Sequence, residues 1–317
     1  MKIEKKRKLI TLTRKVAGRG LCKYDSIYTS ISYLTGSLIA FSRKEMKLTF
    51  QSYLNRPNIK EEYEGAFVFP PEKGVYRGGI GTIDFNSLYP SSIRTCNMSI
   101  ETYVGKISRM NVLFDNDTQR RAYNMEEYID LNDESIDELW FYPTQNGKRK
   151  LVKRADILKL VETKCIYTRN NTLFLKHSVK QGVISAWCKH FYNLRKSTKK
   201  KGKQIEFDLY KGTIPEDQIV QATLDAANLD ADQHSLKIML NSVYGMFGTN
   251  HSPIYSAVIA QSITRTGKFC NISASKFIKK EFARRFGITD DYPIVASGDT
   301  DSVVGSTKVC IRCNNAA

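Results

Sequence analysis

The sequence has no long apolar run. Nowhere in its 317 residues does it approach the roughly 20 consecutive apolar residues that a membrane-spanning helix needs. Its first segment is basic without a sustained apolar stretch, so it is not typical of a secretory signal. Internal repeats and low-complexity tracts are missing as well. We therefore expect a soluble protein of the cytoplasm with no membrane partner.

Regular cysteine spacing is also missing. The seven cysteines are scattered along the chain, and an odd, irregular set argues against a disulfide framework and for a reducing compartment. Cys310 and Cys313 form one C-x-x-C pair, but neither a second pair nor a nearby histidine completes a zinc site. We interpret this pair as incidental.

What the sequence does have is a basic surplus. Hydrophobic residues make up 41% of the chain, enough for a buried core and, at this length, about two domains. The formal net charge of +17 favours a polyanionic partner, because basic side chains displace condensed counterions from phosphates. A soluble protein that is merely basic is the alternative on charge alone.

Apolar spacing predicts several elements. Ile80, Ile83 and Phe85 indicate a short strand that Pro90 prevents from continuing. Residues 1–60 are basic and mixed in character, and they resemble the end of a region more than a domain. The acid-rich residues 110–140 predict a solvated insertion, since a metal site there would lack regular ligand spacing.

The second half of the chain has helical periodicity. Ile184, Trp187, Phe191 and Leu194 predict a helix from about residue 180. We expect further helices at about 231–246 and 254–285, the latter stopped by Arg284, Arg285 and Gly287. Residues 293–305 read as two short strands around a turn.

Three aspartates stand in places suited to metal binding. Asp84 ends the first predicted strand, and Asp299 and Asp301 lie in the last predicted turn. Magnesium needs only a few carboxylates on rigid backbone, and nucleotidyl transfer uses two such ions. For the isolated G-D-T-D-S segment, a capped turn without metal is the alternative.

Two helix faces offer cations. Arg195 and Lys199 are four residues apart on one predicted helix, and Lys237, Asn241 and Tyr244 share a face of the next. Arginine grips phosphate bidentately and lysine supplies a point charge. A solvated face is the alternative for the first pair. The stretch around Lys237 is otherwise apolar, which predicts an anionic partner because an unpaired buried charge is costly.

Three segments resemble, in order, the signature motifs of one family. D-F-N-S-L-Y-P-S-S-I (84–93) resembles motif A of family B DNA polymerases, K-I-M-L-N-S-V-Y-G (237–245) motif B, and S-G-D-T-D-S (297–302) motif C, whose usual first residue is tyrosine. Y-R-G-G (76–79) and F-Y-N-L-R-K (191–196) are similar to the family's Y-x-G-G element and first fingers helix. The run after motif A is similar to the tailed-bacteriophage branch.

The resemblance implies roles for the matching residues. Asp84 and Asp301 would bridge two Mg²⁺ ions with Asp299 beside them, these three being the catalytic acids, while Tyr89 would select the sugar and Tyr244 check the base pair. The other matches would bind metal (the Phe85 backbone), the nucleotide (Ser87, Leu88, Arg195, Lys199, Lys237 and Asn241) and DNA (Tyr76, Gly78 and Gly79).

The resemblance also implies the architecture. We expect an α+β right-hand polymerase palm with an inserted antiparallel helical fingers hairpin, and neither thumb nor exonuclease. The expected parts are a basic connecting segment (1–65), a first palm part with the acidic insertion (66–182, insertion about 110–140), the fingers (183–248) and a second palm part truncated after motif C (249–317).

The implied function is DNA-directed DNA polymerase activity. The partners would be primer–template DNA, deoxynucleoside triphosphates and a second polymerase chain, since we expect a fragment or one piece of a split enzyme. For a viral protein the site would be the host cytoplasm. The alternatives are a catalytically inactive nucleic-acid-binding remnant and a protein-primed polymerase of the same family.

Overall fold

The computed structural model describes residues 9–25, 32–47, 63–71, 75–76, 80–143, 148–250, 252–286, 295–306 and 310–311. Helices and antiparallel strands form two compact units, which confirms the predicted α+β class. One helix, α5 (Leu88–Thr95), runs from the second unit into the first. The first unit comprises Met1–Lys60, Ile93–Thr102 and His177–Ala257, and the second comprises Glu61–Ser92, Tyr103–Lys176 and Val258–Ala317.

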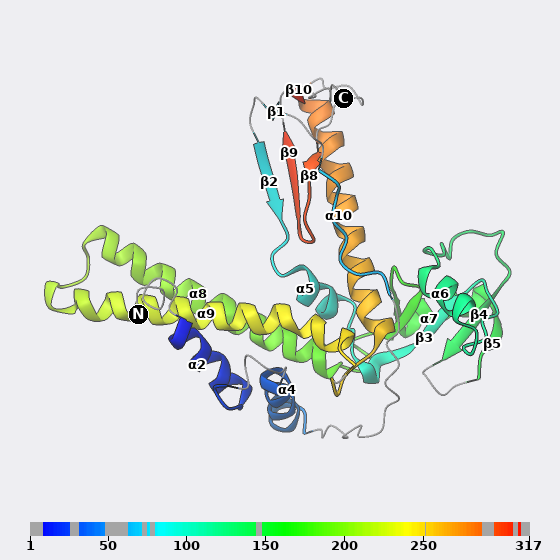
Figure 1. Ribbon diagram of the computed structural model, residues 1–317, viewed down its shortest axis with the longest axis horizontal. Coiled ribbons are helices and arrows are strands. Elements are labelled where there is room, and N and C mark those ends of the chain that lie inside the picture. The colour runs from blue at the N-terminus through cyan, green and yellow to red at the C-terminus, as the bar shows by residue number, and fades with distance from the viewer. Residues whose placement is uncertain are drawn as a thin grey trace. The chain divides into compact units, whose positions relative to one another are not determined.

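The first unit is built on a hairpin of two long helices, α8 (Val183–Lys211) and α9 (Ile219–Gly248) (Figure 1). The predicted apolar face of α8 is confirmed, because Ile184, Trp187 and Phe191 are buried. Gly212 ends α8 with a φ of 67°, a left-handed conformation that glycine adopts without strain. The short helices η1 (Ile100–Thr102) and η2 (Glu216–Gln218) complete the unit's connections.

Two N-terminal helices pack with this hairpin. Helix α2 (Leu9–Gly20) lies beside α9, and α4 (Ser32–Glu45) lies beside α8. Asp232 Oδ1 is 2.9 Å from Arg19 Nη2 and 3.0 Å from Lys15 Nζ. The buried Trp187 donates its indole N–H to Ser37 Oγ at 3.1 Å. These contacts join the described part of the basic N-terminal segment to the core of the first unit.

Helix α9 is longer than its apolar periodicity predicts. It begins at Ile219 instead of about residue 231. Its first turns face solvent, with Val220 72% and Leu224 53% exposed, and buried positions become frequent only from Ala231 onward. Periodicity detects burial, so a helical segment that buries little leaves no such signal.

The second unit contains a three-stranded antiparallel sheet beside α10 (Ala257–Phe286) (Figure 1). Its order is β2 (Ile80–Asp84), β9 (Ser302–Ser306), β8 (Val295–Ser297), which confirms the predicted strands and the turn between the last two. Val303 of β9 and Ile278 of α10 are buried in one cluster. A two-stranded pair joins β1 (Val75–Tyr76) to β10 (Cys310–Ile311), and Cys313 lies outside the described residues.

Helix α10 begins three residues later than expected and ends as predicted. Arg284 and Arg285 lie in its last turn, and both pair with Glu281 at 2.9 and 3.2 Å. The expected stop residue Gly287 lies outside the described residues. Among the residues that the structure describes, no helix is both long and apolar enough to span a membrane.

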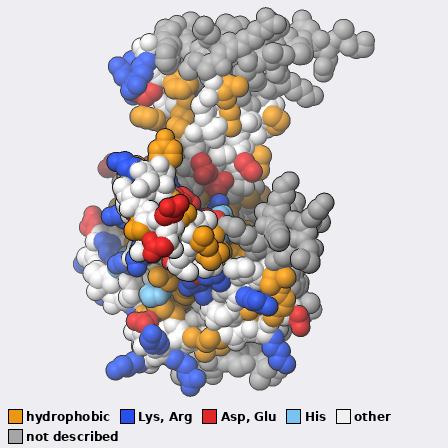
Figure 2. Space-filling model, turned by 90° about the vertical axis from the view of Figure 1, so that its left-hand side faces the viewer, with side chains coloured by type: hydrophobic (Ala, Val, Ile, Leu, Met, Phe, Trp, Pro, Cys, Tyr) orange, Lys and Arg blue, Asp and Glu red, His pale blue; other side chains and the backbone are white. Residues whose placement is uncertain are grey.

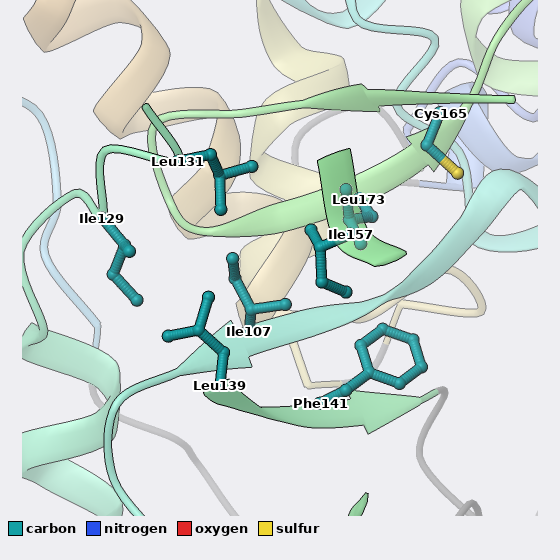
Figure 3. Close-up of a cluster of buried hydrophobic side chains, with 8 residues drawn as sticks. All are labelled: Ile107, Ile129, Leu131, Leu139, Phe141, Ile157, Cys165 and Leu173. Carbon is teal, nitrogen blue, oxygen red and sulfur yellow. The ribbon is translucent and has the colours of Figure 1, made fainter. Parts of the chain in front are cut away.

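The second unit also contains a five-stranded antiparallel sheet with a closed core. Figure 3 shows apolar side chains of its strands converging with Ile157 of α7 (Arg154–Thr163) and with Ile129 and Leu131 from the segment before β4 (Glu138–Pro143). The strand order is β5 (Lys150–Lys153), β4 (Glu138–Pro143), β3 (Tyr103–Ser108), β7 (Thr172–Leu175), β6 (Cys165–Tyr167), with helices α6 (Asp117–Met125) and α7 (Arg154–Thr163).

The predicted solvated insertion at 110–140 is wrong as a description of the whole segment. Most of its carboxylates are exposed, as expected. The same segment nevertheless forms α6 and part of β4, and it buries Val112, Tyr123, Ile129 and Leu131. The acids dominate its composition, but a few apolar residues between them are enough to fold it onto the sheet.

Candidate active site

Two of the three candidate aspartates lie at one end of the three-stranded sheet. Asp84 is the last residue of β2 and pairs with Ser302, the first residue of β9. Directly beyond this pair, the Phe85 N–H donates to the Asp301 carbonyl at 2.7 Å. Asp84 is exposed and Asp301 partly so. The backbone therefore brings these two carboxylate-bearing residues to the same end of adjacent strands.

The third aspartate uses its side chain locally. Asp299 Oδ1 accepts the Thr300 N–H at 2.7 Å, and the Ser302 N–H bonds the Asp299 carbonyl at 3.2 Å. Asp299 thus caps its own turn, as the alternative reading of a short acidic turn expects. Among the described residues, no group of three or more His, Cys, Asp or Glu side chains is close enough together to hold a metal ion.

The donor set of Asp84 and Asp301 fits a hard cation such as magnesium. Carboxylate oxygens are the ligands that this ion takes from proteins, usually one or two of them, while water and phosphate complete its shell. Both residues are accessible enough for the ion to keep water. The two carboxylates are thus chemically suited to such an ion, whereas Asp299 uses one carboxylate oxygen within its own turn.

The chain turns sharply just after Asp84. Ser87 has a φ of 57°, in the left-handed region that a non-glycine residue seldom adopts. Helix α5 follows at once, with Leu88 and Tyr89 as its first residues and Pro90, which lacks an N–H, third. The first N–H groups of a helix have no partner within it, so this turn points backbone donors away from the helix, as an anion site requires.

Tyr89 lies close to the acids. It is partly buried, and burial is the main cause that raises the pKa of Tyr89 to about 12, with repulsion from Asp301, Tyr63 and Asp299 adding to it. The phenol therefore stays protonated at neutral pH. Its ring rests on α10, where a Cβ added to Gly267 would lie 2.9 Å from the Tyr89 Cε1.

The candidate cations belong to the first unit, whereas the acids and Tyr89 belong to the second. In the hairpin, a Cβ at Gly202 would lie 3.4 Å from the Leu229 Cβ, which fixes the register of α8 against α9. The two helices of the hairpin run in opposite directions. Seven residues before Gly202 on α8 and seven residues after Leu229 on α9, Arg195 therefore lies level with Leu236, the neighbour of Lys237. The hairpin thus brings cationic residues of two helices to one level.

The prediction that Lys237 sits in an apolar environment is wrong. Lys237 and Asn241 are exposed, while the apolar neighbours Leu236 and Leu240 are buried on the other side of α9. The segment is amphipathic, so the charge carries no burial cost and needs no partner for stability. Lys199 is also exposed, and Arg195 and Tyr244 are half-buried.

Figure 2 shows blue Lys and Arg side chains at several separate places on one face, with hydrophobic side chains between them. Of the predicted DNA-contacting residues, Tyr76 has its backbone in β1. Its side chain, Gly78 and Gly79 lie outside the described residues.

Two site neighbours were missed by the sequence analysis. Asn271 donates to backbone carbonyls of the turn that holds Asp299, and Gly267 makes room for Tyr89. Both lie on α10, four residues apart, and neither belongs to a chemical motif. Their partners are far away in the sequence, so spacing along the chain gives no signal for them.

Comparison with known proteins decides the family. The sequence profile of DNA polymerase family B matches residues 34–312. The chain belongs to DNA polymerase family B. The order of its three motifs and the pairing of Asp84 with the turn of Asp301 agree with that membership.

Its family B relatives include cellular and viral proteins. The chain is 28% identical over 254 residues to the DNA polymerase delta catalytic subunit of Schizosaccharomyces pombe, which covers 78% of this chain and 18% of the relative. It is 30% identical over 253 residues to a DNA polymerase of Paramecium bursaria Chlorella virus NY2A, covering 79% and 21%. The chain therefore spans about a fifth of the length of these relatives.

A solved structure shares the fold. The family B DNA polymerase of the archaeon Pyrobaculum calidifontis matches with a TM-score of 0.53 at 19% identity, covering 95% of this chain and 29% of that one. At this identity the match shows the fold alone.

Proposed function

We propose that this chain is the catalytic core of a DNA-directed DNA polymerase, which adds deoxynucleotides to the 3′-hydroxyl of a primer on template DNA. The observation that carries the proposal is the backbone pairing of Asp84 with the Asp301 turn, closed by the 2.7 Å hydrogen bond from the Phe85 N–H. Family membership supports the reaction class, while the site supports the residues.

The proposed metal is magnesium. Asp84 and Asp301 would hold it, with the Phe85 carbonyl and Asp299 beside them. Two such ions supply activation of the attacking hydroxyl and neutralisation of the leaving group. The residues' own part is to fix the carboxylates on two hydrogen-bonded strands, so that little reorganisation accompanies the reaction.

The proposed nucleotide-binding residues come from two separate segments of the chain. Arg195, Lys199, Lys237 and Asn241 would bind the triphosphate from the α8–α9 hairpin, which corresponds to the fingers (183–248). The N-terminal turn of α5, with Ser87 and Leu88, would donate backbone N–H groups to phosphate oxygens of the nucleotide. The palm would comprise 66–182 and 249–317.

Two tyrosines complete the proposed site. Tyr89 would lie under the sugar, where its protonated ring, packed against Gly267 of α10, would exclude a 2′-hydroxyl. Tyr244, on the same helix face as Lys237, would contact the nascent base pair. Tyr76, Gly78 and Gly79 would contact template.

Primer extension with magnesium tests the proposal. The purified chain should extend a primed template, and Asp84→Asn or Asp301→Asn should lower incorporation at least about 100-fold, because several kcal/mol of charge stabilisation are lost. Asp137→Asn is the matched control, since it removes an exposed carboxylate far from these strands in the sequence. Equal activity in Asp301→Asn and the control would reject the site.

A second candidate is a nucleic-acid-binding protein without catalysis. It is favoured by the finding that no three metal-binding side chains come together among the described residues. Gel shifts with primer–template separate the two candidates. Binding without incorporation, at any magnesium concentration, would support the second and refute the first. Transfer of a nucleotide onto a separate protein would instead indicate protein priming.

A further inference from the structure

One buried side chain of α10 contacts the turn that carries two of the candidate acids. Asn271 is fully buried, with 0% exposure. Its Nδ2 donates to the Asp299 carbonyl at 2.9 Å and to the Thr300 carbonyl at 2.8 Å. These carbonyls belong to the peptide groups on either side of Thr300, one following Asp299 and the other preceding Asp301. A single amide thus ties both peptide groups to α10.

The neighbouring carbonyls of the turn accept from backbone donors. The Gly298 carbonyl accepts the Phe69 N–H at 2.9 Å, and the Asp301 carbonyl accepts the Phe85 N–H at 2.7 Å. Three separate segments therefore satisfy four consecutive carbonyls. The two outer bonds come from the backbone N–H groups of Phe69 and Phe85. Both middle carbonyls accept from the Asn271 side chain, and the Asp299 carbonyl also accepts the Ser302 N–H at 3.2 Å.

The amide is not explained by packing. Asn271 Oδ1 is buried without a hydrogen-bond partner among the described residues, and such an unsatisfied acceptor costs free energy. An apolar residue of similar size would fill the same space without that cost. The two donated hydrogen bonds are what an apolar residue could not supply.

We propose that Asn271 is a positioning residue for Asp301, the proposed metal ligand of this turn. By fixing the peptide groups on both sides of Thr300, it sets the direction in which the Asp299 and Asp301 carboxylates leave the turn. This inference rests on the proposed role of Asp301 in metal binding. Residues that orient metal ligands typically change metal affinity by about 10- to 100-fold when replaced.

The test measures metal affinity without requiring turnover. Mn²⁺ binding to the full chain is followed by electron paramagnetic resonance for the wild type and Asn271→Leu, which removes both donors at similar volume. The dissociation constant should rise about 10-fold or more, and magnesium-dependent primer extension should need correspondingly more metal.

The matched control is Ser262→Ala. Ser262 is equally buried on α10, but its hydroxyl contacts Thr172 Oγ1 at 2.9 Å and Asn170 Nδ2 at 3.2 Å. This variant should lower the melting temperature without changing Mn²⁺ affinity. If Asn271→Leu does not fold, Asn271→Ser, which keeps one donor, takes its place.

Each outcome decides the inference. Unchanged Mn²⁺ affinity in a folded Asn271 variant, an equal loss in Ser262→Ala, or no Mn²⁺ binding by the wild type would overturn it. Weakened Mn²⁺ binding in the variant, from a wild type that extends no primer, would support the positioning role and reject the proposed polymerase activity.

Discussion

The interior of the second unit contains a lysine whose removal should change the pH dependence of stability. Lys106 on β3 has 0% exposure. Its Nζ donates to the Tyr123 carbonyl at 2.7 Å and lies 4.1 Å from the centre of the Tyr123 ring. Burial, and then repulsion from Arg265, lower the pKa of Lys106 to about 7, while Glu126 opposes the change.

The size of the effect follows from this pKa. Lowering it from 10.5 to about 7 corresponds to about 5 kcal/mol at 1.36 kcal/mol per pH unit. Below pH 7 Lys106 is charged in both the folded and the unfolded chain, so the full cost of burying the charge is present. Between about pH 7 and 10.5 the unfolded chain binds more protons, so the free energy of unfolding rises with pH. Above that range the cost is gone.

Urea unfolding at several pH values measures this contribution. Between pH 7 and 9.5 the wild type should gain about 3 kcal/mol relative to Lys106→Met, with equal m-values. Subtracting the variant cancels every other group that titrates in this range. Lys159→Met, which removes an exposed lysine from α7, controls for the change in net charge. Parallel pH curves for the wild type and Lys106→Met would refute the reasoning.

Two glycine substitutions and one tyrosine substitution test the candidate site and the five-stranded sheet. Gly267→Ala places a Cβ 2.9 Å from the Tyr89 Cε1, so the ring must shift away from α10. The KM for deoxynucleotides in primer extension should rise. An unchanged KM would contradict a nucleotide-binding role for the Tyr89 ring in its position against Gly267. Tyr89→Ala should increase ribonucleotide incorporation, and unaltered sugar selection would argue against its role. Gly105→Ala places a Cβ 2.5 Å from the Tyr142 carbonyl and should cost about 1–3 kcal/mol in urea unfolding; a neutral result would contradict the close approach of β3 and β4.

Much of the fold could be predicted because burial leaves a periodic pattern. Ile184, Trp187 and Phe191 recur at helical spacing and are all buried in α8. The start of α9 could not be predicted this way, since its first turns bury little. Composition misled twice, once where the acids of 110–140 concealed a few core residues, and once where Lys237 seemed to lie among apolar neighbours that face the other side.

The placement of Asp84 and Asp301 at strand ends could be predicted, but the residues that contact this region from α10 could not. Asp84 and Asp301 can be located because each lies at a predicted strand end or turn and within a recognisable motif. Asn271 donates to a carbonyl 28 residues away, and Gly267 contacts Tyr89 on a distant helix. Such contacts form only when α10 packs in the folded protein, so a single sequence gives no local pattern from which to predict them.

Two local costs near the acids favour the polymerase proposal over binding without catalysis. Ser87 has a φ of 57°. This left-handed conformation costs on the order of 1 kcal/mol or more in a non-glycine residue, and it persists only where the surrounding structure imposes it. Asn271 keeps a buried oxygen without a partner among the described residues. The core needs neither, because a glycine and an apolar residue would relieve both. A surface that only binds DNA depends mainly on spread positive charge, whereas catalysis needs carboxylates held in fixed directions. Both costs lie where the carboxylates would be held: the strained Ser87 follows Asp84 in the chain, and Asn271 contacts the turn that contains Asp301.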